Sequence, residues 1–450
     1  MIGRPLRRFV ARASRQTSDR WLYAWALGYA AVGAASLLVP LYAIALGADP
    51  FVVGLVEATA GLAGVPGALI WGRLADETGG RRGFVLGSLF GAGAVLIGFP
   101  LLSAPVAVVL LNGVLWFVVS AASPVVTLFM IEGAPESEWE TRIGLLNAFQ
   151  RYGWVGGLLV GVGWLGAVAT GLDLPAIAAQ RGLFYLCAAA TVAATPLAFY
   201  WLPPRTTTTP GRLARSGALG RLVAGGRYVK LVAFVPLRSL FTRRIRRPTR
   251  LLTRFSPGLR RYFVVVFLFS AAFSVFFGPA PAYLADLRYD STAIFGFFIV
   301  SNFVSAVVFV PIGRLTARLA PATLQLRALA VRTALFPALG LVGILSAWWL
   351  RTGSITLGFA LIGLTWAVVA VTAAGLVSRA APTHLRGEAL GIYTALSGIG
   401  AGLGGAVGGA IANAAGYTVA FGVAGLLVGV SALVLLTMTP ALPTGVDTGG

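Results

Sequence analysis

The stretch WGRLADETGGRR, from Trp71 to Arg82, places two acids and three arginines between two long apolar runs. Similar apolar runs fill most of the chain, because 58% of its 450 residues are hydrophobic and only 11% are charged. A soluble protein of this length would carry far more charge. The composition therefore indicates a membrane protein, and the charged stretch is interpreted as a loop at the membrane surface.

Apolar runs long enough to span a bilayer follow one another along the chain. A helix needs about 20 apolar residues to cross about 30 Å of hydrocarbon. The runs predict an all-α polytopic membrane protein with twelve transmembrane helices. The expected spans are 21–46, 51–72, 83–102, 105–131, 143–170, 181–202, 259–285, 292–314, 326–350, 354–378, 388–413 and 417–438.

These spans divide into two six-helix bundles, at 21–202 and 259–438. A cytoplasmic N-terminal arm (1–20), a basic cytoplasmic linker (203–258) and a cytoplasmic tail (439–450) complete the chain. The division between the third and fourth spans depends on three residues only, Leu102 to Ala104.

The distribution of basic residues predicts the orientation. With a cytoplasmic N-terminus, all but four of the 35 lysines and arginines fall on cytoplasmic segments; Arg181, Arg288 and Arg351 fall outside, and Arg151 lies within a span. This bias is the positive-inside rule. It predicts a multi-pass protein of the cell membrane with both termini in the cytoplasm. The net charge of +21 reflects that orientation, so we expect no nucleic-acid partner.

The linker 203–258 is rich in arginine and contains no acid. We expect this charge to keep it in the cytoplasm. The alternative is that its mixture of apolar and basic residues binds anionic lipid headgroups.

The two halves of the chain repeat each other. A shift of 241 residues places GRLAD (72–76) on GRLTA (313–317), and PLY (40–42) on PAY (281–283). A later shift of 247 residues superposes two stripes of glycine spaced four residues apart. These stripes are Gly153, Gly157 and Gly161 in the first half, and Gly400, Gly404 and Gly408 in the second. The halves therefore derive from a duplication.

The charged stretch resembles the loop motif between spans 2 and 3 of the major facilitator superfamily, roughly G-x-L-x-D-x-x-G-R-[RK]. The matching residues are Gly72, Leu74, Ala75, Asp76, Gly79 and Arg81. Gly80 stands where arginine is usual, and Glu77 stands where a base is usual. The second-half copy keeps Gly313, Arg314 and Arg318, with Ala317 in place of the aspartate. The resemblance extends over the whole chain through span number, linker and repeat, but it selects no subfamily.

The resemblance implies that two bundles rock about a central site. Asp76 would then meet the N-terminus of span 11, near 386–389, when the cytoplasmic side is closed. Arg81 and Arg82 would orient the aspartate or hold the inner edge at the headgroups. The alternative is that these residues only fix a tight turn and set the topology. We expect the glycine stripes of spans 5 and 11 at the bundle interface, where they allow close helix approach.

Two charged residues inside spans are functional candidates, because intramembrane charges are costly. Glu57 in span 2 has small apolar neighbours that favour the protonated form, which suits a proton-coupling acid. Its alternatives are a structural hydrogen bond or a carboxylate at the outer interface. Arg151 in span 5 can receive an anionic substrate group, extend toward the cytoplasm or pair with Glu132. We do not expect Glu57 and Arg151 to pair with each other.

Spans 1, 4, 7 and 10 line the central cavity in the family, and candidates also come from spans 5 and 8. The candidate residues are Tyr29, Asn112, Trp116, Arg151, Tyr283, Asn302, Thr365 and Trp366. This aromatic and nearly uncharged set favours an amphipathic or hydrophobic substrate. The alternative is that these side chains pack between helices.

Together these features predict a secondary transporter that moves a small organic solute by alternating access, with proton-coupled efflux as the first hypothesis. An uptake permease for a sugar, organic anion or other metabolite is one alternative, and a non-transporting sensor is another. We expect no enzyme, cofactor or metal site, because the only histidine, His384, lies in a loop and the acids form no cluster within a span. With one lysine, Lys230, no ATP-binding P-loop is present. We expect a monomer.

Overall fold

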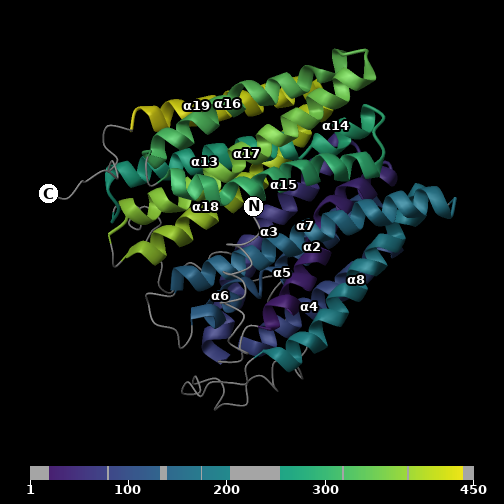
Figure 1. The fold of residues 1–450 in the computed structure, drawn as a ribbon, viewed down its shortest axis with the longest axis horizontal. Helices are drawn as coiled ribbons and strands as arrows, with labels where there is room; N and C mark the ends of the chain where they lie inside the picture. Colours follow the sequence, from purple (N-terminus) through teal and green to yellow (C-terminus); the bar gives the residue numbers. More distant parts are fainter. Residues whose placement is uncertain are drawn as a thin grey trace, which may run out of the picture.

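The computed structural model describes residues 20–78, 81–131, 139–173, 175–202, 254–316, 319–382 and 385–438. The N-terminal arm, most of the linker and the tail lie outside these ranges, so the lipid-binding hypothesis for the linker stays a prediction. The described chain is helical and lies in two bundles, the C-terminal one above the N-terminal one in Figure 1.

The helices of each bundle are as follows. The N-terminal bundle contains α2 (Trp21–Ala45), α3 (Pro50–Thr78), α4 (Arg81–Gly98), the short 3-10 helix η2 (Phe99–Leu101), α5 (Pro105–Val119), α6 (Ser123–Ile131), α7 (Trp139–Gly171) and α8 (Ala176–Trp201). The C-terminal bundle contains α13 (Pro257–Phe277), α14 (Ala280–Asp286), α15 (Ser291–Leu315), α16 (Pro321–Leu341), the 3-10 helix η5 (Val342–Ile344), α17 (Trp348–Ala380), α18 (Arg386–Ala415) and α19 (Tyr417–Leu436).

Ten helical segments in the described part of the chain are long and apolar enough to cross a membrane. The other two expected spans correspond to 105–131, which the turn at 120–122 divides into α5 and α6, and to α7. The protein is therefore an all-helical, multi-pass membrane protein. The number of twelve spans and the cytoplasmic position of both termini stay predictions.

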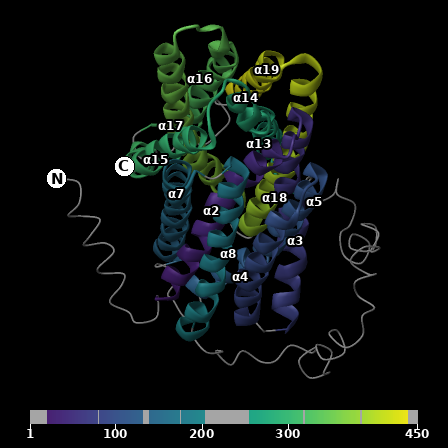
Figure 2. The same ribbon diagram turned by 90° about the vertical axis from the view of Figure 1, so that its right-hand side faces the viewer.

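Each bundle packs around its first helix. In the N-terminal bundle α2 contacts α7 and α8, and in the C-terminal bundle α13 contacts α18 and α19. Between the bundles, α3 lies along α18 and α7 lies along α15, as Figure 2 shows. These two pairs bring the expected spans 2 and 11, and 5 and 8, together.

The expected boundary between spans 9 and 10 was wrong. Arg351 was placed in a loop, but it lies in the first turn of α17, and the chain leaves helical structure earlier, at 345–347. The Tyr283 hydroxyl donates to the carbonyl of Leu339 (2.9 Å) and accepts from the N–H of Gly343 (3.1 Å). This side chain satisfies backbone groups at the end of α16, and the helix ends there.

The same contact occurs in the first half of the chain. Tyr42 precedes Tyr283 by the repeat shift of 241, and its hydroxyl donates to the carbonyl of Leu102 (2.9 Å). Leu102 lies in the break between η2 and α5, so the third and fourth helices are separate there. Both halves therefore use this tyrosine to bond backbone groups near the end of their third span. The sequence repeat at these two tyrosines is therefore accompanied by a repeat of their hydrogen bonds.

The two predicted glycine stripes pack mainly inside the bundles, so their expected place at the bundle interface was wrong for five of the six residues. A Cβ on these five would overlap the backbone of the first helix of the same bundle, in the pairs Gly153–Ala26, Gly157–Ala30, Gly400–Phe267, Gly404–Ala271 and Gly408–Val275. The first four pairs are repeat equivalents, because the shift of 241 also relates the α2 and α13 partners. Only Gly161 faces the other bundle, against Phe295 of α15.

A different glycine stripe forms the bundle interface. It lies on another face of α18 and packs closely against α3. Its members are Gly398, Gly402, Gly405 and Gly409 on α18, with Gly54 and Gly61 on α3. Added Cβ atoms would collide with backbone at Gly54, Gly61, Gly405 and Gly409, and with α3 side chains at Gly398 and Gly402. Small residues permit this direct backbone contact between helices in a membrane. The sequence analysis did not single out these residues.

Candidate functional site

A cavity of about 400 Å³ lies between the two bundles. Helices α2, α3, α5 and α7 form one wall, and α13, α14, α15, α17 and α18 contribute to the other. Its aromatic lining consists of Trp116, Trp154, Phe277, Phe298 and Trp366. The charged residues that line it are Glu57 and Arg151. This size and lining are typical of a small-molecule site.

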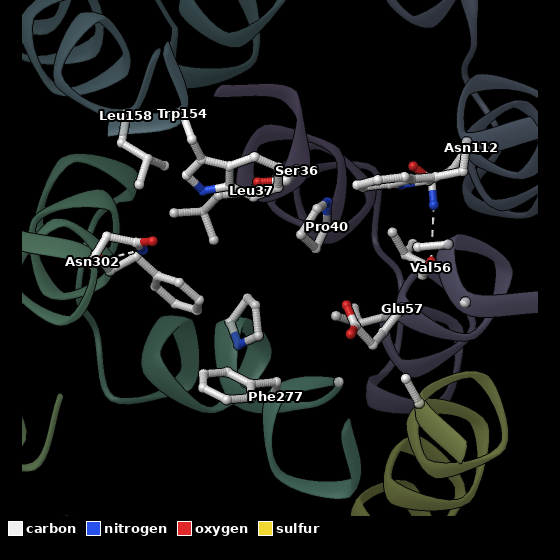
Figure 3. A pocket seen from close by; sticks show the side chains of 18 of the residues that line it. Ser36, Leu37, Pro40, Val56, Glu57, Asn112, Trp154, Leu158, Phe277 and Asn302 are labelled. Atoms are coloured by element: carbon white, nitrogen blue, oxygen red, sulfur yellow. Dashed lines mark hydrogen bonds between the residues drawn. The ribbon is translucent and has the colours of Figure 1, made fainter. Parts of the chain in front are cut away.

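Glu57 lies in the second turn of α3, and its carboxylate points into the cavity (Figure 3). The Ser274 hydroxyl of α13 donates to the Glu57 Oε1 atom at 3.3 Å. This hydrogen bond connects the two bundles. A Cβ on Gly405 of α18 would lie 3.0 Å from the Cβ of Glu57, so the acid sits where the two bundles are in close contact. The carboxylate therefore faces the cavity and not the outer interface.

Arg151 lies on α7, and its side chain is exposed to the cavity. Its guanidinium carbon is 5.9 Å from the centroid of the Phe309 ring. The described residues include no ion-pair partner for Arg151. Glu132, one of its expected partners, lies outside the described residues. The cation is thus available to an anionic group inside the cavity.

Two asparagines on the cavity wall use their amide groups for hydrogen bonds to helices, one to a neighbouring helix and one to its own. The Asn112 Nδ2 atom of α5 donates to the Val56 carbonyl (2.9 Å) and to Thr59 Oγ1 (3.1 Å) of α3. Figure 3 shows the first of these bonds beside Glu57. The Asn302 Nδ2 atom donates to the Phe298 carbonyl of its own helix (2.9 Å). Asn112 therefore fixes α3 at the turn that carries the acid.

The structure brings five of the eight predicted cavity residues to the wall: Asn112, Trp116, Arg151, Asn302 and Trp366. The other three lie elsewhere. Tyr29 packs beside Gly153 on α7, and Tyr283 caps α16 as described above. Thr365 is buried and accepts a hydrogen bond from Arg332. Tyr283 and Thr365 were wrong as wall residues because their hydroxyls bond groups of neighbouring helices. Tyr29 is not among the lining residues.

Arg332 was expected among the cytoplasmic basic residues, and that prediction was wrong. Arg332 is fully buried in α16, eleven residues after the helix begins at Pro321, or about 17 Å along its axis. Its Nε donates to Thr365 Oγ1 and its Nη2 to the Ile362 carbonyl, both at 2.8 Å. Its depth within the apolar run LAVRTALF was the signal that could have found it.

Arg332 lies behind the cavity wall. Its guanidinium carbon is 3.8 Å from the centroid of the Phe273 ring, and that ring is 6.1 Å from Trp366 on the wall. The Nη1 atom is buried and has no hydrogen-bond partner. A buried cation with a free donor is costly in a membrane protein.

The predicted gate motif is only partly described. Arg82 donates to the Phe199 carbonyl, and its guanidinium carbon is 4.5 Å from the Phe199 ring, so it links α4 to the end of α8. Gly79 and Arg318 lie outside the described residues, as do the side chains of Asp76, Arg81 and Arg314. The contact between Asp76 and span 11 stays a prediction.

Comparison with known proteins agrees with this architecture. Residues 22–404 match the family described as Major Facilitator Superfamily. No curated protein matches the chain significantly.

Solved transporters share the fold over nearly the whole chain. The nucleoside transporter NupG has a TM-score of 0.66 at 14% identity, covering 94% of this chain and 99% of its own. The inward-open xylose transporter XylE from E. coli has a TM-score of 0.65 at 15% identity, covering 96% and 97%. A structure titled for substrate recognition in proton-dependent oligopeptide transporters has a TM-score of 0.67 at 16% identity, covering 94% and 98%.

At these identities the solved structures establish the fold alone. The family match covers most of the described helices, and the two-bundle fold is shared with these solved transporters. The chain belongs to the major facilitator superfamily.

Proposed function

We propose that the protein is a proton-coupled secondary transporter of a small amphipathic organic compound, and that it exports this compound. The observation that carries the proposal is the position of Glu57. This acid faces an aromatic cavity and accepts a hydrogen bond from Ser274 of the opposite bundle.

Protonation of Glu57 can be coupled to movement of the two bundles. Burying an ionised carboxylate in a low-dielectric site is costly, and protonation removes that cost. The Ser274 hydroxyl binds the ionised carboxylate more strongly than the neutral acid. Protonation of Glu57 therefore changes the relative free energies of the states in which the bundles are joined or separated at this contact. A solute bound in the same cavity then moves in exchange for the proton.

Two features support the choice of solute and driving force. Five aromatic side chains line the cavity, which suits an amphipathic body. Among the solved structures of this fold, one group is titled as proton dependent.

A second candidate is uptake of an organic anion, because Arg151 is exposed to the cavity without an ion-pair partner among the described residues. An anionic group bound there would form charge-assisted hydrogen bonds.

The test uses purified full-length protein in liposomes with a trapped pH dye. Tetraphenylphosphonium, benzoate, glucose and uridine are added under an imposed pH gradient, with wild type, Glu57→Gln and the loop control Asp173→Asn. The proposal expects proton movement triggered by at least one of these solutes, lost in Glu57→Gln and kept in Asp173→Asn. Proton movement that survives Glu57→Gln overturns Glu57 as the coupling site. Movement with benzoate alone favours the anion permease, and binding without any flux favours a sensor.

A further inference from the structure

We propose that the substrate is a dipolar amphipath, a compound with a cationic and an anionic group separated by an apolar, preferably aromatic, body. This proposal rests on the proposed function and names the substrate class of the same cavity. Glu57 would receive the cationic end and Arg151 the anionic end.

The first evidence is the charge of the cavity wall. Glu57 on α3 and Arg151 on α7 line the same cavity, and no other charged residue lines it in the part of the chain that the structure describes. The two do not form an ion pair with each other, and neither pairs with another charged side chain in the described ranges. The polar contact of Glu57 is the neutral Ser274 hydroxyl, and the neighbours of Arg151 are the Phe309 ring and Tyr29. Each charge is therefore free for a solute.

The second evidence is the apolar surface that the other bundle presents to the cavity. The other bundle presents Phe277, Phe298 and Trp366 to the cavity, together with the amide of Asn302. Its own buried cation, Arg332, lies behind Phe273 and outside the lining. The C-terminal bundle therefore offers surface for an apolar body and no competing charge. A cavity of about 400 Å³ holds one small aromatic compound with two polar ends.

The cost of leaving a charge unpaired in the cavity differs between classes of solute. A solute with a single charge pairs with one wall residue and leaves the other charge in a site from which water has been displaced, and this is costly. A neutral solute leaves both charges uncompensated. A dipolar solute pairs with both, and its net charge of zero adds nothing to the cavity. The wall therefore selects opposite charges on one molecule.

The proposal also defines the exchange at Glu57. When the ammonium group of the solute binds, the carboxyl O–H bond breaks and its proton goes to water, and an ammonium–carboxylate ion pair replaces it. Charge and protons balance in this step. Proton and solute thus compete for one carboxylate, which is the requirement for exchange transport.

The test measures binding, so it needs no proton gradient. Full-length protein in detergent is titrated calorimetrically with para-(aminomethyl)benzoate, whose amine and carboxylate lie at opposite ends of a ring. The matched probes are para-methylbenzoate (anion), para-methylbenzylamine (cation) and para-methylbenzyl alcohol (neutral). We expect the dipolar probe to bind at least about tenfold more tightly than each matched probe.

The variants assign the two ends. Glu57→Gln is expected to reduce affinity for the dipolar probe to that of the anion, and Arg151→Gln to that of the cation. Arg151→Lys, which keeps the charge, should retain the preference. The controls Asp173→Asn and Arg260→Gln change exposed charges outside the cavity and should leave every affinity unchanged. Melting curves verify that each variant is folded.

The outcomes separate this proposal from the proposed function. Equal affinity for the dipolar and single-charge probes overturns the substrate class, as does a preference that both Glu57→Gln and Arg151→Gln leave intact. Dipolar preference without proton movement in liposomes overturns proton coupling alone. Proton-coupled flux of single-charge solutes without dipolar preference overturns the substrate class alone.

Discussion

The Ser274 hydroxyl of the C-terminal bundle donates a hydrogen bond to the Glu57 carboxylate of the N-terminal bundle at 3.3 Å. This polar contact connects the two bundles. The contact lies beside Gly405, where α18 approaches the backbone of α3. A titratable group is thus placed at the point where the bundles must separate if they rock. A change in the protonation of Glu57 therefore changes the contact that connects the two bundles.

We predict that Ser274→Ala weakens this link without removing proton coupling. The lost hydrogen bond is worth about 1 kcal/mol, or roughly a fivefold change in a conformational equilibrium. Leu172 and Ile344 are exposed residues of opposite bundles and can carry spin labels. We expect the distribution of distances between the two labels to broaden toward longer distances.

The control is Thr394→Ala, because the Thr394 hydroxyl bonds within its own helix. An unchanged distance distribution in Ser274→Ala would show that the contact does not hold the bundles together.

We predict opposite effects for two neighbouring glycines of α18. A Cβ on Gly405 would lie 2.9 Å from the backbone nitrogen of Ala58 on α3, so Gly405→Ala should disfavour this conformation and lengthen the label distance across the bundles. Gly404 faces Ala271 of its own bundle. Gly404→Ala should therefore lower thermal stability, by about 1–3 kcal/mol, with little change in bundle separation.

The matched control is Gly391→Ala, whose added methyl group meets open space in the same helix. It should keep the label distance and slightly raise stability, because alanine favours helix. If Gly405→Ala behaves like Gly404→Ala, the interface does not open.

The sequence predicted the fold well because apolar length, charge bias and repeats are properties of a helix and its membrane. It placed Glu57 and Arg151 in spans for the same reason, since an isolated charge in an apolar run is visible. It could not tell which face of a helix turns toward the cavity. Tyr283 and Thr365 were misplaced because each satisfies a tertiary hydrogen bond, and such partners lie 33 to 60 residues away in the chain.

We predict equal roles for Tyr42 and Tyr283, the repeat-related tyrosines. Tyr42→Phe removes the donor to the Leu102 carbonyl, and Tyr283→Phe removes the donor to the Leu339 carbonyl and the acceptor of the Gly343 N–H. A lost hydrogen bond costs about 0.5–1.5 kcal/mol, so both variants should melt at lower temperature. The control is Tyr185→Phe, because Tyr185 is exposed. Altered solute affinity in Tyr283→Phe at unchanged melting temperature would instead make this residue part of the binding site.

Replacing Arg332 can either raise or lower the melting temperature, and the direction shows whether the buried charge contributes to stability. Arg332→Met removes a buried charge and keeps the bulk beside Phe273. Thr365 stays satisfied, because its hydroxyl already bonds the Leu361 carbonyl at 2.8 Å. Replacing buried charges by apolar groups is often neutral or stabilising, so the methionine variant should melt at or above the wild-type temperature.

Arg332→Lys keeps the charge but cannot reproduce both hydrogen bonds, to Thr365 and to the Ile362 carbonyl. It should therefore be less stable than both wild type and Arg332→Met, by about 3 kcal/mol against the wild type. The measurement is thermal unfolding of all three proteins in the same detergent, with solute binding recorded alongside. A stable methionine variant that no longer binds solute would show that Arg332 is kept for the cavity, because stability alone would not require the charge.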